Sequence, residues 1–149
     1  MKHTKLMTAV IGLAVAGTIA TGAQTAHSEI TIVDESIPQS LTGKPGNAEN
    51  GKKVIINRKK GNCLACHVMP IPDQQFHGLT GTDLHGVASR MEVAELRMRI
   101  VDPKVVNPDT MMPSFHKTGQ HRVLKKFQGK TILSAQEVED VIAYLMLLK

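Results

Sequence analysis

The apolar residues of this chain recur at helical spacing, and no run of alternating residues is long enough to predict a sheet. The clearest stripe lies at the C-terminus, where Ser134 and Glu137 form a capping box that marks the start of a helix. After that box the apolar positions fall on one helical face: Val138, Val141, Ile142, Leu145 and Leu148. The pattern therefore predicts a terminal helix that packs this face on a core.

Two further helices are predicted upstream. Asn47 offers an N-cap for a helix over 48–60. Ser89 with Glu92 forms a second capping box, and the helix it begins should end before Pro103, because proline disfavours a helical conformation in its predecessor. We therefore expect an all-α domain of three to four helices.

Two stretches between these helices are predicted to be non-helical. Residues 68–86 hold three glycines and two prolines, which predicts a long loop folded over something, such as the edge of a cofactor. Pro108 and Pro113 hold the segment around Met111 and Met112 extended. A segment of that kind can direct a side chain inward.

The N-terminus has the features of a secretory signal peptide. Lys2 and Lys5 precede an uncharged apolar stretch that ends in small residues, so we assign 1–28 to the signal and 29–149 to the mature domain, with cleavage between 23 and 28. An uncleaved membrane anchor is the alternative, because no Lys, Arg, Asp or Glu lies between Lys5 and Glu29. The Thr, Gly and Ala content favours cleavage, and we expect no membrane span in the mature form.

Composition narrows the classes of function. The formal net charge is +5, and loss of the two signal lysines leaves about +3, so nucleic acid is not an expected partner. The chain has three Phe, one Tyr and no Trp, which is little aromatic volume for a core. A large apolar cofactor would supply what is missing.

Cys63, Cys66 and His67 form the pattern C-x-x-C-H, a haem-attachment motif. A disulfide is the usual fate of two cysteines in an exported protein, but their spacing argues against it. A structural zinc site needs four ligands and no second cysteine pair exists, while a thioredoxin-like dithiol needs alternating strands and helices. We therefore predict one covalent haem c on Cys63 and Cys66, with His67 as an axial iron ligand.

The second axial ligand separates an electron carrier from a sensor, and a methionine is typical of carriers. Met112 is the preferred candidate, because Pro113 favours an extended backbone that presents the thioether, and Met111 is the alternate. Met69 is too close to His67 to reach the opposite haem face. The remaining methionines outside the leader sit at helical spacing and are predicted to pack in the core: Met91, Met98 and Met146.

Histidine is the competing ligand type, with four candidates outside the leader and the motif: His77, His85, His116 and His121. The usual role of each is a surface or loop position, although His116 lies only four residues past Met112. A backbone carbonyl should accept the other ring proton of His67. The stretch 70–72 is placed to provide that carbonyl.

A basic cluster lies beside the motif: Lys52, Lys53, Arg58, Lys59 and Lys60. A solvated helix face is the plainer interpretation. A docking patch around the haem edge is the functional interpretation, since complementary charge speeds encounter with a partner. The two are compatible.

Three segments are more specific than the haem motif alone: RKKGNCLACHVMP at 58–70, NPDTMMPSF at 107–115 and VEDVIAYL at 138–145. Together they resemble the SoxX family, the monohaem subunits of SoxAX cytochromes, from about Gly51 onward. The resemblance implies a class I cytochrome c fold packed around one covalently bound haem, with Met112 as the distal ligand. It also implies that Gly51 and Tyr144 lie where the first and last helices cross.

The resemblance further implies a function in the bacterial periplasm. A SoxX protein pairs with a SoxA haem subunit, which conjugates thiosulfate to a cysteine of the carrier SoxYZ, an L-cysteine S-thiosulfotransferase reaction. SoxX would take up the released electrons and pass them to a downstream small cytochrome. No nucleophile and base pair is recognisable, so no bond-making residue is assigned to this chain. The alternatives are a free, soluble cytochrome c that shuttles electrons between respiratory complexes, and a haem sensor with an open sixth position.

Overall fold

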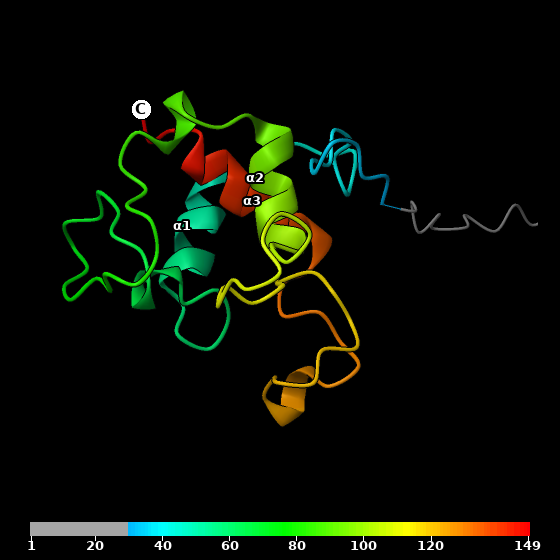
Figure 1. Cartoon of the computed structure of the whole chain (residues 1–149). Helices are drawn as coiled ribbons and strands as arrows, with labels where there is room; N and C mark the ends of the chain where they lie inside the picture. Colours follow the sequence, from blue (N-terminus) through cyan, green and yellow to red (C-terminus); the bar gives the residue numbers. More distant parts are fainter. Residues whose placement is uncertain (1–29) are drawn as a thin grey trace, which may run out of the picture.

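The computed structural model describes residues 30–149, so the predicted signal peptide lies outside the described residues. It contains three α-helices: α1 (Ala48–Ile56), α2 (Val93–Val101) and α3 (Ala135–Leu145) (Figure 1). Three short 3-10 turns lie in the connections: η1 (Cys63–Ala65), η2 (Val87–Ser89) and η3 (Lys125–Phe127). Over 30–149 there is no strand beyond one isolated bridge between Val33 and Ser36. The predicted all-α architecture is confirmed.

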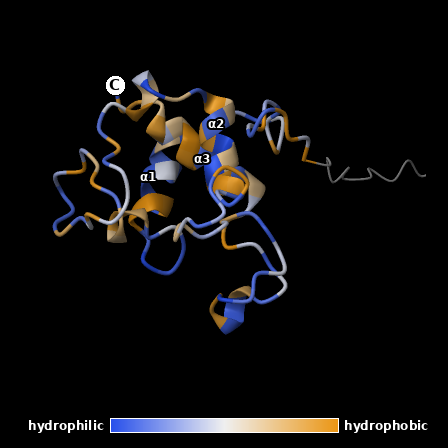
Figure 2. Ribbon diagram, viewed as in Figure 1, coloured by the Kyte–Doolittle hydropathy of each residue, from blue (hydrophilic) through white to orange (hydrophobic). Residues whose placement is uncertain are grey.

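Helix α3 forms the centre of the core. The five residues of its predicted apolar face are buried, and Figure 2 shows hydrophobic residues gathered where the three helices meet. The predicted capping box is also confirmed, because the Glu137 amide donates to Ser134 Oγ at 3.3 Å and the Ser134 amide donates to Glu137 Oε2 at 2.9 Å. None of the helices within 30–149 is long and apolar enough to cross a membrane.

Helices α1 and α3 cross with their backbones in close approach at Gly51. A Cβ at that position would lie 2.0 Å from the carbonyl oxygen of Asp140, so only glycine fits. The atoms nearest this Cβ belong to Asp140 and Val141, and Asp140 lies one helical turn before Tyr144, the residue that the resemblance placed at this crossing. Tyr144 is half-buried and packs against the core.

Helix α1 ends at Ile56, four residues before the end at Lys60 that the sequence predicted. Asn57 explains the difference, because its side-chain Oδ1 accepts from the Lys59 amide at 2.9 Å and its carbonyl accepts from the Asn62 amide at 3.1 Å. These bonds replace the next helical turn with a loop over 57–62. The loop carries the chain from the end of α1 to the cysteine motif.

The start of α2 also differs from the prediction. Ser89 ends the short turn η2, and the N-cap of α2 is Glu92. The Glu92 amide donates to the Glu95 side chain at 2.8 Å, so the box that caps the helix lies three residues later than expected. The capping-box pattern occurs twice in this segment, at 89–92 and at 92–95. The second copy caps the helix.

Candidate functional site

A crevice runs from the molecular surface into the core between η1 and two distant segments of the chain. Its outer part is a cavity of about 640 Å³, lined by the cysteine motif on one side and by the segments 110–115 and 122–132 on the other. A second cavity of about 200 Å³ reaches the apolar core beneath α2 and α3. The two cavities share five lining residues, so they are neighbouring parts of one crevice: Cys63, His67, Thr82, Met112 and Phe115.

The motif forms a single tight turn at the crevice wall. The carbonyl of Cys63 accepts from the amides of Cys66, at 3.1 Å, and His67, at 2.9 Å, which brings all three side chains to the cavity. No disulfide joins Cys63 to Cys66, so both sulfurs are available for other bonds. Burial raises the pKa of the Cys63 thiol to about 12, so this thiol is protonated at neutral pH. A reactive dithiol or a zinc site needs a thiolate, and this environment disfavours one.

The imidazole of His67 is oriented by the far end of the long loop. Its Nδ1 lies 2.6 Å from the carbonyl oxygen of Thr82. A carbonyl only accepts, so Nδ1 carries the proton and Nε2 keeps a lone pair for a metal. The prediction that residues 70–72 supply this carbonyl is wrong, because the loop returns to the motif through residues 78–82.

Two glycines allow that return. The amides of Gly78 and Gly81 donate to the carbonyls of Leu64 and Cys66, both at 2.8 Å. A Cβ at Gly81 would lie 2.5 Å from Cε1 of His67, and one at Gly78 would lie 2.0 Å from the Ala65 carbonyl oxygen. Nothing in the sequence indicates these contacts, because the long loop has no periodicity that shows which residue faces the motif.

Met111 and Met112 both line the crevice but differ in depth. Met111 is 78 % exposed and borders only the outer cavity. Met112 is half-buried, borders both cavities and packs against the hydrophobic core. The preference for Met112 over Met111 therefore gains a second, independent argument.

The extended segment that carries Met112 is held at several points. The Phe115 amide donates to the Ile100 carbonyl at 3.0 Å, and Ser114 Oγ donates to Asp102 Oδ1 at 2.7 Å. Lys117 Nζ donates to the other Asp102 oxygen at 2.6 Å. Burial opposes ionisation of Asp102 most strongly, but the bonds from Lys117 and Ser114 outweigh it and hold the pKa of this carboxyl below its usual value. Nothing in the sequence near Asp102 indicates this anchoring role, because its partners Ser114 and Lys117 lie 12 and 15 residues downstream.

The other candidate ligands lie elsewhere. Among residues 30–149, His67 is the sole histidine that lines either cavity. His116 Nδ1 lies 2.9 Å from the Leu133 carbonyl oxygen, and His85 Nδ1 lies 2.6 Å from Asp83 Oδ1. Met98 is fully buried, while Met91 and Met146 pack against the core, as predicted.

These features fit a haem bound at its edge through two thioethers. The crevice has apolar walls, two cysteine sulfurs on one rim, an imidazole with a free Nε2, and a thioether at greater depth on the segment opposite. The model of the cytochrome c family matches residues 48–149, so the chain belongs to the cytochrome c family and has its all-α class I fold. It binds one covalent haem c through Cys63 and Cys66.

A solved structure narrows the assignment. The crystal structure of SoxXA from P. pantotrophus contains a chain that is 38 % identical, with a TM-score of 0.74 over 84 % of this chain and 98 % of that one. The chain is therefore a SoxX-like cytochrome. No curated protein matches the sequence significantly.

Proposed function

We propose that this cytochrome is the electron-transfer subunit of a periplasmic complex that oxidises thiosulfate. The observation that carries the proposal is the crevice itself, which presents one imidazole and one half-buried thioether from distant segments. Two strong protein ligands leave an iron no open position for substrate, which suits electron transfer. The similarity to a SoxXA chain supports the choice of sulfur oxidation.

The residues have distinct roles in this proposal. Cys63 and Cys66 would hold the haem covalently, and His67 Nε2 and Met112 Sδ would bind its iron. When bound, the haem supplies one-electron redox chemistry. Thr82 fixes the tautomer and orientation of His67, and the bonds of Ser114 and Phe115 fix the backbone next to Met112.

Bond-making chemistry belongs to a partner. We assign the conjugation of thiosulfate to a carrier cysteine to a SoxA-like haem subunit, with a SoxYZ-like protein as the carrier. Joining thiosulfate to a thiol through a new S–S bond releases two electrons, which this subunit takes up one at a time and passes to a downstream small cytochrome. The chain is then a subunit of an L-cysteine S-thiosulfotransferase without bond-making residues of its own. We further propose that residues 1–28 direct export and are removed.

The test is reconstitution. The haem-loaded chain is produced together with a SoxA-like subunit, and the purified pair is mixed with carrier protein and thiosulfate. We expect co-purification and reduction of this chain's haem that requires both carrier and thiosulfate. A monomer whose haem stays oxidised would favour the free shuttle, and carbon monoxide binding to the reduced chain would favour the sensor.

A further inference from the structure

The long loop between the motif and η2 carries two apolar side chains that stand almost fully in solvent. Phe76 is 92 % exposed and Leu79 is 85 % exposed, the highest values among the large hydrophobic residues of 30–149. Neither residue lines the crevice. Figure 1 shows this loop projecting to one side of the three helices. Its outer part, residues 74–81, is called the loop tip below and is an apolar surface separate from the cofactor site.

The backbone holds Phe76 outward in an unfavourable conformation. Its φ is +61°, in the left-handed region that a residue with a bulky side chain rarely adopts. Exposure of the ring adds a second cost, because its apolar area stays in water. Strained residues of this kind persist where the surrounding structure enforces them, and they cluster at functional positions. The strain and the exposure together indicate that Phe76 serves a contact outside this chain.

The loop tip is anchored on both sides of Phe76. The Met69 amide donates to His77 Nδ1 at 3.3 Å. The amides of Gly78 and Gly81 donate to carbonyls of the cysteine motif at 2.8 Å. The apolar side chains are therefore presented on a preformed surface, so a partner would not have to order the loop.

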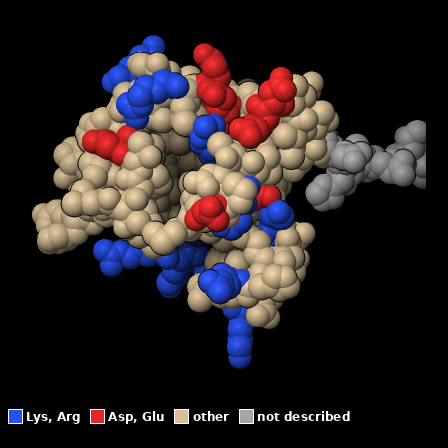
Figure 3. Space-filling view, viewed as in Figure 1, with Lys and Arg blue, Asp and Glu red and all other residues tan. Residues whose placement is uncertain are grey.

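The loop tip also carries no Asp, Glu, Lys or Arg, since residues 74–81 read QQFHGLTG. The carboxylate that precedes it, Asp73, is paired with Lys52 at 2.9 Å. Figure 3 shows no Lys, Arg, Asp or Glu side chain on the outermost part of the projecting loop. Depletion of charge with an aromatic residue at the centre is typical of the core of a protein interface, and permanent interfaces are the more hydrophobic ones.

We propose that the loop tip is the surface by which this chain binds permanently to an apolar, concave face of the SoxA-like haem subunit. A concave face can surround a projecting loop and bury Phe76 as an aromatic anchor. The loop tip adjoins the motif through Gly78 and Gly81, so a partner bound there lies beside the haem attachment turn. The inference rests on the proposed function and adds the face that meets the partner.

Two other occupants fit the loop tip less well. Two facing tips, with two large apolar side chains each, would bury well under the about 1,000 Å² that a specific interface needs, which disfavours a second copy of this chain. Anionic lipid attracts basic segments, but the loop tip has no Lys or Arg and is flanked by Asp73 and Asp83. A protein partner with an apolar pocket is the occupant that the size and the charge of the loop tip favour.

The test is binding of the oxidised, haem-loaded chain to a SoxA-like subunit from the same organism, without carrier or thiosulfate. The variant Phe76→Ser/Leu79→Ser should raise the Kd at least about tenfold. The control Val33→Ser/Leu147→Ser removes two exposed apolar side chains elsewhere and should leave the Kd nearly unchanged. Raising the salt to about 0.5 M should weaken parent binding little, because the loop tip contributes no charge to be screened.

Hydrogen–deuterium exchange locates the contact independently of the variants. The amides of 75–77, 79 and 80 donate to no backbone acceptor within residues 30–149, so they should exchange fast in the free chain and slowly in the complex. Unchanged exchange at these amides would overturn the proposal, and so would equal changes of Kd in the two double variants. A parent chain that dimerises, or that sediments with phosphatidylglycerol vesicles, through the loop tip would also overturn it.

The two proposals can fail separately. A complex that protects the loop tip but whose haem stays oxidised with carrier and thiosulfate would contradict only the proposed function. A complex whose haem is reduced while the loop tip stays unprotected would contradict only the proposed surface. A parent chain that binds no SoxA-like subunit would overturn both.

Discussion

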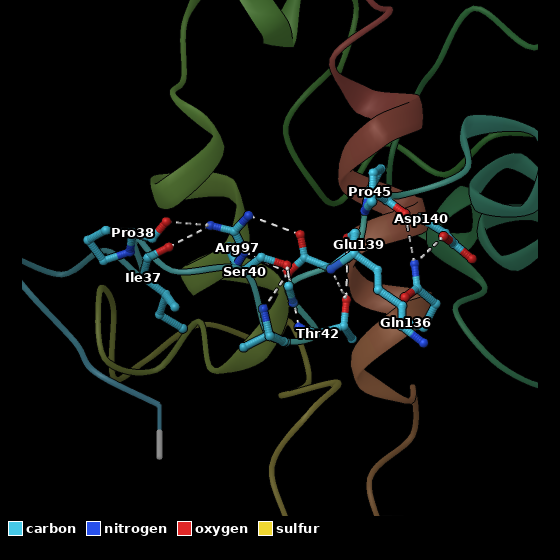
Figure 4. Close-up of polar contacts among 12 residues, drawn as sticks. Ile37, Pro38, Ser40, Thr42, Pro45, Arg97, Gln136, Glu139 and Asp140 are labelled. Atoms are coloured by element: carbon cyan, nitrogen blue, oxygen red, sulfur yellow. Dashed lines mark hydrogen bonds and ion pairs between the residues drawn. The ribbon is translucent and has the colours of Figure 1, made fainter. Parts of the chain in front are cut away.

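Arg97 on α2 and Glu139 on α3 form a buried, bidentate ion pair that also holds the N-terminal segment in place. Arg97 Nε and Nη2 donate to the two Glu139 oxygens at 2.8 and 2.9 Å, and the residues are only 4 % and 6 % exposed (Figure 4). Arg97 Nη1 donates to the Ile37 carbonyl at 2.6 Å, and the Leu41 amide donates to Glu139 Oε1 at 3.0 Å. Two helices and the segment before α1 therefore meet at one pair of charges.

Replacing Glu139 with Ala should be strongly destabilising. The variant leaves the Arg97 guanidinium buried without its partner, which costs about 3–5 kcal/mol in the free energy of unfolding. The double variant Arg97→Met/Glu139→Leu removes both charges and should cost clearly less than the sum of the two single variants. Urea unfolding of the haem-loaded proteins measures both quantities, and additive losses would show that the two charges act independently.

Gly51→Ala should be among the most damaging single-methyl changes in the chain. The added Cβ meets backbone atoms of Asp140, which cannot rotate away, so the helices must separate at a cost of about 3 kcal/mol or more. Gly43→Ala is the matched control, because nothing lies within 4 Å of its Cβ and only its φ of +65° opposes alanine, at about 1 kcal/mol. Thermal unfolding of the two variants gives the comparison, and equal losses would contradict tight packing at the crossing.

What could be predicted from the sequence was local. The apolar face of α3, its capping box at Ser134 and Glu137, and the cysteine turn each depend on residues within a few positions of one another, and the structure has all three. Periodicity and capping depend on one or two helical turns, so contacts with distant segments do not change them.

What could not be predicted depends on contacts between distant segments. Nothing near Thr82 indicates that its carbonyl faces His67, because that contact exists only after the loop returns to the motif. Which backbone atoms of α3 meet Gly51 depends on how the two helices pack. Asn57 ends α1 because its side chain accepts from the Lys59 amide and its carbonyl accepts from the Asn62 amide, in place of another turn of helix. Pattern alone does not decide such competitions.

Asp102→Asn should destabilise the segment that carries Met112 in a pH-dependent way. At pH 7 the variant loses the charge-assisted bond from Lys117, at about 1–2 kcal/mol. Because the pKa of Asp102 is lowered in the folded state, its contribution is present above the unfolded value of about 3.9 and is lost as the pH falls through the folded pKa. The gap between parent and variant should thus stay constant from about pH 7 to 5 and close below about pH 4.

Urea unfolding over a pH series measures this gap. Asp109→Asn is the control, because Asp109 is exposed in the same region and its side chain takes no part in the bonds that anchor Ser114. The control should stay close to the parent throughout. A gap for Asp102→Asn that persists unchanged into acid would mean that the carboxylate charge contributes nothing and that the packing of Asp102 is what matters.

Met112→Ala should remove the weak near-infrared band that a methionine ligand gives to the oxidised protein. Met111→Ala is the matched control, because Met111 is its chain neighbour but lies at the exposed outer rim of the crevice, and that variant should keep the band. Loss of the thioether ligand should also lower the reduction potential, since methionine favours reduced iron. If the band persists in Met112→Ala and disappears in Met111→Ala, the ligand is Met111 and the segment must rotate inward when the haem binds. If the parent shows no band, iron ligation by methionine is wrong, and the open-site sensor becomes the better hypothesis.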